Sequence, residues 1–218
     1  MIKGYLFDYG GTLDTAGCHW GQKLWHTYQR RQVPVTEQQF RDAYVYGERY
    51  LGNNPIIRPT DTFHHTLDVK LRLEMEYLCA HGWDADEEEF HRLHDIVLED
   101  VYRQVIETTT HSAKVLTELQ KKYPMVLVSN FYGNIRTVLK EFQLDEFFQD
   151  VVESAEVGIR KPDPRIWEIG VERLGMQPEE VVVVGDSFYK DVEPAVLMMT
   201  CMGTVSVSSV SASRMSFA

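Results

Sequence analysis

The sequence predicts an α/β fold in which a parallel sheet is interrupted, after its first strand, by a helical insertion. Three short apolar runs support the sheet, and each is followed directly by polar residues; the runs lie at residues 5–7, 125–128 and 181–184. From about residue 18 to residue 107, apolar residues instead recur at helical spacing. Ligands bind beyond the carboxyl ends of the strands in open parallel sheets. We therefore expect the polar residues after the three runs to meet at one site.

The first fifteen residues are expected to form a buried strand and a tight turn at Gly10-Gly11. Four helices should follow in the insertion, since leucine, phenylalanine, methionine and valine side chains lie on one face of each. They are expected from about Trp20 to Arg31, after Thr36, over 62–81 and over 86–105. Asn53-Asn54-Pro55 separates the second helix from the third. Four consecutive helices predict a small bundle.

Strands and helices alternate after the insertion. Ser112 is expected to cap a helix that reaches Lys122. Three further elements should follow: a strand at 125–129, a helix around 135–142 and a short strand at 151–152.

Turn residues mark the last part of the chain. Asp163 should cap a helix with Pro164 at its first position, and Gly175 should end that helix. The remaining expected elements are a strand at 181–184 buried on both faces, a helix over 191–199 and a short strand at 205–207.

Composition excludes several classes of function. The 218 residues suffice for one large domain or two small ones. A net charge of −11 argues against non-specific binding to nucleic acid or to anionic membranes. No apolar stretch is long enough to span a bilayer, and the N-terminus does not resemble a signal peptide. Cys18, Cys79 and Cys201 are too scattered for a disulfide framework or a zinc site, which favours a cytoplasmic protein. Its oligomeric state cannot be predicted from the sequence.

The residues that end the strands have complementary chemistry. Asp8 follows the first strand, and a carboxylate there can attack phosphorus to form an aspartyl-phosphate. The glycines after it, Gly10 and Gly11, allow backbone N–H groups to approach an anion, and Thr12 completes this turn. Ser129 and Asn130 can offer a hydroxyl and an amide to the same phosphoryl oxygens.

Positive charge and metal ligands come from later in the chain. Lys161, in the turn Arg160-Lys161-Pro162, is a point charge for phosphate and for Asp8. Asp186 and Asp191 offer the oxygen ligands that Mg²⁺ prefers. A metal ion and a lysine would together offset the repulsion between an anionic nucleophile and an anionic substrate. Each residue alone is explained as well by a cap, a loop or a solvated surface, but their common order at strand ends favours a site.

These segments together resemble the four motifs of the haloacid dehalogenase (HAD) superfamily. Residues 7–14 are similar to its first motif, Ser129 to its second, residues 161–164 to its third, and Gly185-Asp186-Ser187 with Asp191 to its fourth. The helical insertion resembles the type C1 cap. The resemblance spans nearly the whole chain and implies a Rossmann-like core with a parallel sheet, formed by residues 1–16 and 108–218. Residues 17–107 would form the helical cap domain.

The resemblance also implies roles for the motif residues. Asp8 would be the nucleophile, and Asp8, the carbonyl of Gly10 and Asp186 would hold Mg²⁺, with Asp191 binding the ion or supporting its ligands. Ser129 and Lys161 would bind phosphate. The expected function is Mg²⁺-dependent hydrolysis of a small phosphorylated metabolite.

One position departs from the family pattern. Phosphatases of the family usually carry a second Asp two residues after the nucleophile as general acid and base, and this chain has Gly10 there. Loss of a general acid costs about 10²–10⁴-fold in rate, and less for an acyl phosphate or an activated ester. His19 could replace the acid, although a surface histidine is the simpler interpretation.

The missing acid leaves other functions open. A phosphonate hydrolase would need a cap lysine that forms a Schiff base; Lys23 is the better candidate, because Lys70 is expected on a solvated face. A dehalogenase would also use Asp8, but would carry Tyr at the position of Gly10. A third alternative is a binding protein that retained the pocket and lost most of its activity.

Overall fold

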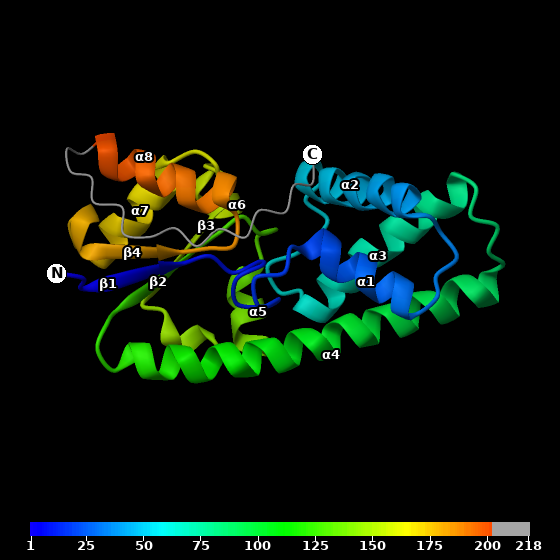
Figure 1. The fold of residues 1–218 in the computed structure, drawn as a ribbon, viewed down its shortest axis with the longest axis horizontal. Helices are drawn as coiled ribbons and strands as arrows, with labels where there is room; N and C mark the ends of the chain where they lie inside the picture. The colour runs from blue at the N-terminus through cyan, green and yellow to red at the C-terminus, as the bar shows by residue number, and fades with distance from the viewer. Residues whose placement is uncertain (202–218) are drawn as a thin grey trace.

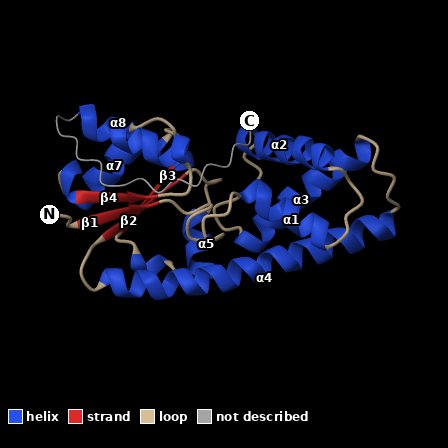
Figure 2. Ribbon diagram, in the orientation of Figure 1, coloured by secondary structure: helices blue, strands red, loops and turns tan. Residues whose placement is uncertain are grey.

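The computed structural model of the chain describes residues 1–201, with side chains up to Met198. The sheet and its helices lie at one end of the molecule, the helices of the insertion lie at the other, and one long helix runs along both (Figures 1 and 2). None of the helices in this described part is both long and apolar enough to cross a membrane.

The sheet has four parallel strands in the order β3-β2-β1-β4. Their bounds are β1 Gly4–Phe7, β2 Met125–Ser129, β3 Asp150–Glu153 and β4 Val181–Val184. Leu6 of β1 is in register with Val126 of β2 and with Val183 of β4. The predicted α/β fold with a parallel sheet is therefore confirmed. The carboxyl ends of β1, β2 and β4 lie at the same edge, where Asp8, Ser129 and Gly185 follow them.

Helices cover both faces of the sheet. On one face, α7 (Arg165–Leu174) packs through Ile166 and Trp167 against Leu6, Val126 and Val128. Gly170 of α7 lets the backbones approach closely, since a Cβ atom there would lie 2.9 Å from Cγ2 of Val128. The smaller elements are α5 Ile135–Glu141, α6 Ser154–Val157, 3₁₀ turns at 145–147 and 178–180, a π-helical turn at 188–192 and α8 Glu193–Cys201.

The insertion forms the four expected helices, α1 Trp20–Arg30, α2 Glu37–Asn53, α3 Phe63–Ala80 and α4 Glu87–Gln120. The last three begin at side-chain caps. Thr36 accepts from the N–H of Gln39, Thr62 from that of His65, and Asp86 from that of Glu89. Each cap satisfies an N–H group that has no partner within its own helix. These caps fix where α2, α3 and α4 start.

The predicted break between Val105 and Ser112 is wrong, because α4 is one helix of 34 residues. Threonines at 108, 109 and 110 have modest helix propensity, but each hydroxyl donates to the carbonyl four residues earlier and stays within the helix. Ser112 caps nothing; its hydroxyl donates to the carbonyl of Leu13 at 2.8 Å. Thus α4 crosses the expected boundary between residues 107 and 108 and is tied to the loop after β1.

Two other expectations can be compared with the structure, and a third cannot. The helix α7 begins at Arg165, so Pro164 is its N-cap and not its first residue, although Asp163 does accept from the N–H of Arg165. Gly175 ends that helix with φ 68°. Strand β4 is not buried on both faces beyond Val181, because it lies at the end of the described sheet. The strand expected at 205–207 lies outside the described residues.

The start of α3 is anchored on the sheet-bearing part of the chain. Glu141, at the end of α5, accepts hydrogen bonds from the N–H groups of Phe63 and His64 and from the hydroxyl of Tyr102. Asn134 donates to Thr66 of α3 at 2.8 Å. A carboxylate at a helix N-terminus is favourable for the helix dipole. These contacts fix α3 beside the carboxyl ends of the strands.

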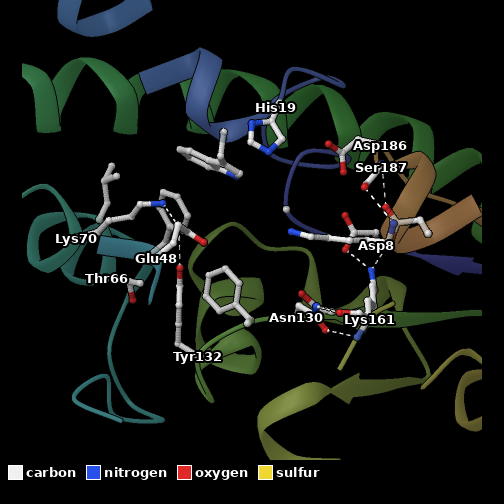
Figure 3. Close-up of a pocket in the computed structure, with 18 of the residues that line it drawn as sticks. Asp8, His19, Glu48, Thr66, Lys70, Asn130, Tyr132, Lys161, Asp186 and Ser187 are labelled. Carbon is white, nitrogen blue, oxygen red and sulfur yellow. Dashed lines mark hydrogen bonds and ion pairs between the residues drawn. The ribbon is translucent and has the colours of Figure 1, made fainter. Parts of the chain in front are cut away.

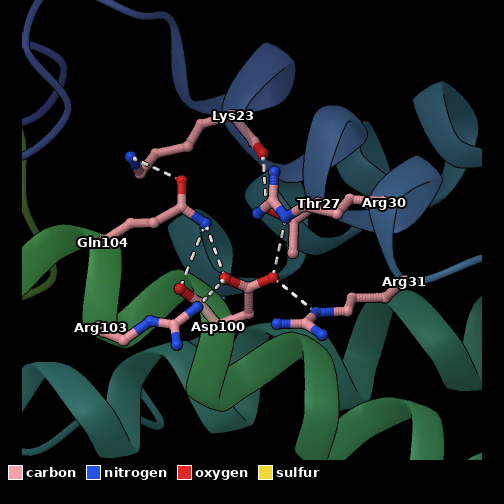
Figure 4. Close-up of polar contacts among 7 residues, drawn as sticks. All are labelled: Lys23, Thr27, Arg30, Arg31, Asp100, Arg103 and Gln104. Atoms are coloured by element: carbon pink, nitrogen blue, oxygen red, sulfur yellow. Dashed lines mark hydrogen bonds and ion pairs between the residues drawn. The ribbon is translucent and has the colours of Figure 1, made fainter.

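A buried carboxylate joins α1 to α4 (Figure 4). Asp100, whose side chain is 2% exposed, accepts from Nε of Arg30 at 3.0 Å and from Nε of Arg31 at 2.6 Å. Arg103 and Gln104 donate to its other oxygen. Burial raises the pKa of Asp100, but the hydrogen bonds from Arg30 and Arg31 outweigh burial and lower it to about 2.

We predict that Asp100→Asn lowers the free energy of unfolding by about 1–2 kcal/mol at pH 7. Because the pKa of Asp100 is lowered in the folded protein, its stabilisation is present above about pH 4 and is lost as the pH falls towards 2. Urea unfolding at pH 7, 5, 4 and 3 measures this difference, with the exposed Asp84→Asn as control. A difference between wild type and Asp100→Asn that stays constant down to pH 3 would contradict it.

Candidate active site

Asp8 is held in place by both of its carboxylate oxygens. Its backbone N–H donates to the carbonyl of Val184 at 2.8 Å, so the residue sits where β1 and β4 end. Oδ1 lies 2.5 Å from Nζ of Lys161, and Oδ2 accepts from the hydroxyl of Thr12 at 3.0 Å. The side chain is 9% exposed. Asp8 is therefore oriented before any substrate binds.

Lys161 bridges two carboxylates that come from different strands. Its Nζ also lies 2.8 Å from Oδ1 of Asp191 and 4.4 Å from the ring centroid of Trp167. Asn130 fixes the backbone beneath it, since Oδ1 of Asn130 accepts from the N–H of Lys161 and Nδ2 donates to its carbonyl. Burial lowers the pKa of Lys161, but Asp8 and Asp191 outweigh burial and raise it. The ammonium group stays charged.

The cluster of carboxylates suits a divalent cation. Asp8, Asp186 and Asp191 each offer an oxygen, and these atoms lie within 4.8 Å of one another. Among the described residues, Lys161 is the cation paired with this cluster, so three carboxylates face one ammonium group and negative charge is in excess. Burial, followed by the charges of Asp8 and Asp191, raises the pKa of Asp186 to about 6. Burial likewise raises the pKa of Asp8, which Lys161 opposes. A bound cation would relieve this repulsion.

The donor atoms fit Mg²⁺ chemistry, because they are all oxygens. The carboxylate of Asp186 is partly exposed to the cavity, and the carbonyl of Gly10 accepts no hydrogen bond from the described residues. Both carboxylate oxygens of Asp191 already accept hydrogen bonds, Oδ1 from Lys161 and Oδ2 from the N–H of Ser187. The carboxylate of Asp186 and the carbonyl of Gly10 are therefore better placed than Asp191 to bind the ion directly, together with Asp8.

The remaining predicted residues divide into two groups. Ser129, the last residue of β2, lines the cavity, and its hydroxyl makes no hydrogen bond with the described residues. Gly11 and Thr12 do not line it; the N–H of Gly11 donates to Asp14 at 2.7 Å, and that of Thr12 to Tyr9. Gly11 has φ 96°, and a Cβ atom there would overlap the Asp186 carboxylate at 2.3 Å. Gly11 thereby lets Asp186 come close to the loop.

Asp14 is a site residue to which the sequence pattern assigned no role. Its side chain is fully buried. Oδ1 accepts a hydrogen bond from the N–H of Gly11, and Oδ2 accepts one from Nε1 of Trp20 at 3.0 Å. Trp20 begins α1, so this contact ties the loop after β1 to the insertion. Burial raises the pKa of Asp14 to about 8. The sequence placed Asp14 in the first motif, but nothing in the spacing of Asp14 and Trp20 predicted that their side chains would be in contact.

A cavity of about 190 Å³ opens at the cluster and extends towards α2 and α3. Asp8, Lys161 and Asp186 lie at one end, and Glu48, Lys70 and Tyr132 lie together at the other (Figure 3). Much of the remaining lining is aromatic or apolar and comes from Trp20, Tyr44, Phe63, Leu67 and Phe131. Lys190, Thr66 and Ser187 also line the cavity.

The two lysines of the insertion are placed differently from the sequence prediction. Lys70 is not solvated; it is 7% exposed, and its Nζ is paired with Oε1 of Glu48. Lys23 does not line the cavity, and its Nζ lies 3.5 Å from Oε1 of Gln104. Burial lowers the pKa of Lys70, but Glu48 and neighbouring acidic groups raise it well above its usual range. An amine that remains protonated is a poor Schiff-base nucleophile.

His19 lines the cavity, but its tautomer limits its chemistry. Its Nδ1 accepts from the backbone N–H of Gly21 at 3.1 Å, so the neutral ring carries its proton on Nε2. Protonation of Nδ1 would break that hydrogen bond. Burial, followed by the charge of Lys190, lowers the pKa of His19. This geometry disfavours the histidine as the replacement acid.

Known proteins share this sequence pattern and fold. The family described as "Hydrolase: haloacid dehalogenase-like hydrolase" matches residues 2–197. Among solved structures, a dehalogenase aligns with TM-score 0.58 and 19% identity over 90% of this chain and 81% of that one. The HAD-hydrolase YfnB from Bacillus subtilis, bound to magnesium, aligns with TM-score 0.53 and 19% identity over 90% and 85%. At such identities these likenesses show the fold.

Curated relatives match a short part of the chain. A glyceraldehyde 3-phosphate phosphatase of Methanopyrus kandleri is 46% identical over 52 residues, which are 24% of this chain and 22% of that protein. A phosphoserine phosphatase of Thermus thermophilus is also 46% identical over 52 residues, or 24% of this chain and 21% of that protein. Nearly four fifths of each relative's own length therefore has no counterpart in these alignments.

The hydrogen bonds of Asn130 give a prediction for the protein without substrate. Asn130→Ala removes both bonds to the Lys161 backbone, and it should lower the free energy of unfolding by about 1–3 kcal/mol. Urea unfolding without phosphate or metal measures the loss, with the exposed Asn53→Ala as control. If Asn130 acted only as a substrate ligand, the unliganded stability would be unchanged, and that result would contradict its role in holding Lys161.

Proposed function

Because the chain belongs to the haloacid dehalogenase-like hydrolases, we propose that it is a Mg²⁺-dependent phosphohydrolase that forms an aspartyl-phosphate on Asp8. One observation carries the proposal: Lys161 joins Asp8 to Asp191 beside Asp186, at the strand ends and open to the cavity. Perturbed and paired titratable groups in a cleft are typical of active sites. The phosphatase names of two partial relatives agree with phosphate as the transferred group.

The proposed reaction has two transfers at phosphorus. A carboxylate oxygen of Asp8 attacks, the bond between phosphorus and the leaving oxygen breaks, and the leaving group departs with the electron pair. Water then attacks the phosphorus of phospho-Asp8, which releases inorganic phosphate and restores the carboxylate. Thr12 and Lys161 hold Asp8 in position, and Lys161 and Ser129 contact the phosphoryl oxygens. Gly11, Thr12 and Asn130 support these contacts by shaping the loop and the turn.

Mg²⁺ would be held by Asp8, Asp186 and the carbonyl of Gly10, with Asp191 alongside. The ion would supply positive charge to the transferring oxygens. Lys161 cannot serve alone, because its ammonium group is shared between two carboxylates. The negative balance of the cluster is what makes an anionic substrate depend on the metal.

The usual proton donor for the leaving group is missing from the loop after β1. Gly10 replaces the usual acid, and His19 is held in a tautomer unsuited to that role. We therefore propose substrates whose leaving oxygen departs without prior protonation, such as acyl phosphates, activated esters or phosphates on an anomeric carbon. The small cavity favours a small metabolite, since ligand pockets commonly measure about 300–1,000 Å³.

The alternatives have less support. A phosphonate hydrolase needs a nucleophilic cap lysine, but Lys70 is paired with Glu48 and Lys23 faces Gln104. A binding protein with little activity is consistent with Gly10, and it would bind Mg²⁺ and phosphate without turning over any phosphomonoester.

The nucleophile and the metal can be tested together. We predict that Asp8→Asn abolishes release of phosphate from acetyl phosphate, because the neutral amide cannot attack phosphorus. EDTA should abolish it too, and excess Mg²⁺ should restore it. The exposed Asp84→Asn serves as the matched control. Unchanged turnover in Asp8→Asn, or in EDTA, would refute the proposal, and binding of Mg²⁺ and phosphate without turnover on a broad panel would favour the binding protein.

The missing acid gives a gain-of-function prediction. A Cβ atom at Gly10 would meet only Trp20, at 3.8 Å, and the residue does not adopt a left-handed conformation, so Gly10→Asp should fold. We expect kcat/KM for an alkyl phosphate such as glycerol 3-phosphate to rise at least about tenfold, within the usual effect of a general acid. Acetyl phosphate, which needs no acid, should gain much less. No gain on glycerol 3-phosphate would point to a replacement acid elsewhere in the site.

A further inference from the structure

The end of the cavity away from Asp8 contains a second ion pair, with a buried lysine and a partly exposed glutamate, which the proposed chemistry does not use. Lys70 of α3 pairs with Oε1 of Glu48 of α2, and the hydroxyl of Tyr132 donates to the same oxygen at 3.2 Å. Tyr132 lies in the loop after β2, only three residues beyond Ser129. All three residues line the cavity (Figure 3). The pair thus faces whatever part of a substrate projects away from its phosphate.

Stability gives little reason to bury Lys70. Removing its charge from water costs several kcal/mol, and an apolar residue of similar size is often at least as stable. Lys70 is 7% exposed, whereas the side chain of Glu48 is 39% exposed. The buried Lys70 and the partly exposed Glu48 are therefore arranged as expected for a pair that binds a ligand in the cavity.

Both partners keep unused hydrogen-bonding capacity. Both contacts to Glu48 use Oε1, and Oε2 makes no hydrogen bond with the described residues. Lys70 has three N–H bonds; one is directed at Glu48, and the ring of Tyr44 lies 4.5 Å from Nζ. The cavity end therefore presents at least one strong acceptor and one strong donor side by side.

The charge of this end selects the kind of ligand. Lys70 and Glu48 carry opposite charges, so a second phosphate or a carboxylate would be repelled by one as it is attracted by the other. Hydroxyl groups can both donate to Glu48 and accept from Lys70 without bringing charge. The aromatic wall of Trp20, Phe63 and Phe131 can cover the carbon skeleton between the two ends.

We propose that Glu48, Lys70 and Tyr132 determine substrate specificity by binding hydroxyl groups on the organic part of a phosphomonoester that carries no further charge. The preferred substrate class is then a sugar phosphorylated on its anomeric carbon, with the phosphate at Asp8 and a leaving oxygen that needs no prior protonation. This inference rests on the proposed phosphohydrolase function and extends it to the leaving group.

The test compares neutral and charged organic groups. We would measure kcat/KM for glucose 1-phosphate, glycerol 3-phosphate, 3-phosphoglycerate, phosphoserine and acetyl phosphate. At least one of the two neutral hydroxylated compounds should be preferred over both 3-phosphoglycerate and phosphoserine, by about tenfold or more. A preference for either charged compound overturns the proposal.

Variants then locate the preference in the three residues. Glu48→Gln and Lys70→Met should each lower kcat/KM for the preferred hydroxylated phosphate about tenfold more than for acetyl phosphate, as expected for a hydrogen bond to a charged group. Tyr132→Phe should have a smaller effect of the same kind. Arg72→Met is the matched control, since Arg72 lies on α3 with its side chain 43% exposed. Equal losses on every substrate would show a structural role and overturn the proposal.

The design separates this proposal from the one on which it rests. If no phosphate is turned over, the hydrolase proposal fails, and calorimetric dissociation constants of the same compounds for the Mg²⁺-loaded protein decide the specificity. Weaker binding of glucose 1-phosphate or glycerol 3-phosphate to Glu48→Gln, with inorganic phosphate unaffected, supports it; unchanged binding overturns it. Should Lys70→Met fail to fold, Glu48→Gln and Tyr132→Phe give the same comparison without deleting a long side chain.

Discussion

The site depends on the ammonium group of Lys161, which lies buried between Asp8 and Asp191. Carboxylates from the ends of β1 and of the turn after β4 would repel each other in a water-poor site, and Lys161 is the cation that lets them converge. Asn130 holds the backbone of Lys161 from the end of β2. The parallel order of the strands brings these groups together, so the fold and the electrostatics of the site require each other.

The insertion is connected to this centre through specific polar contacts. Trp20 at the start of α1 donates to Asp14 of the catalytic loop, and Glu141 accepts from the start of α3. Tyr132 follows the second strand and reaches Glu48 of α2. The same segments that shape the catalytic end thus also position the far end of the cavity. A substrate would be recognised at both ends by one preorganised pocket.

The sheet and the cluster of Asp8, Lys161 and Asp186 could be predicted, because strand ends in a parallel sheet lie at one edge whatever the side-chain details. The continuity of α4 could not, because Ser112 suggested a new helix start, and the threonines before it stay helical through hydroxyl bonds to the carbonyls four residues earlier. The burial of Lys70 could have been found: it shares the apolar face of α3 with Leu67, Leu71 and Glu74. The contacts of Asp14 and Tyr132 depend on how loops pack, which spacing along the chain does not encode.

The central claim is that a phosphoryl group is carried on Asp8, and trapping it is the most direct measurement. Protein quenched in acid during turnover of acetyl phosphate with Mg²⁺ would be reduced with borohydride, which converts an aspartyl-phosphate into homoserine. The account predicts that mass spectrometry of the digested protein finds homoserine at residue 8 and at no other acidic residue. Rapid turnover with residue 8 unmodified, or with the modification at another residue, would contradict it.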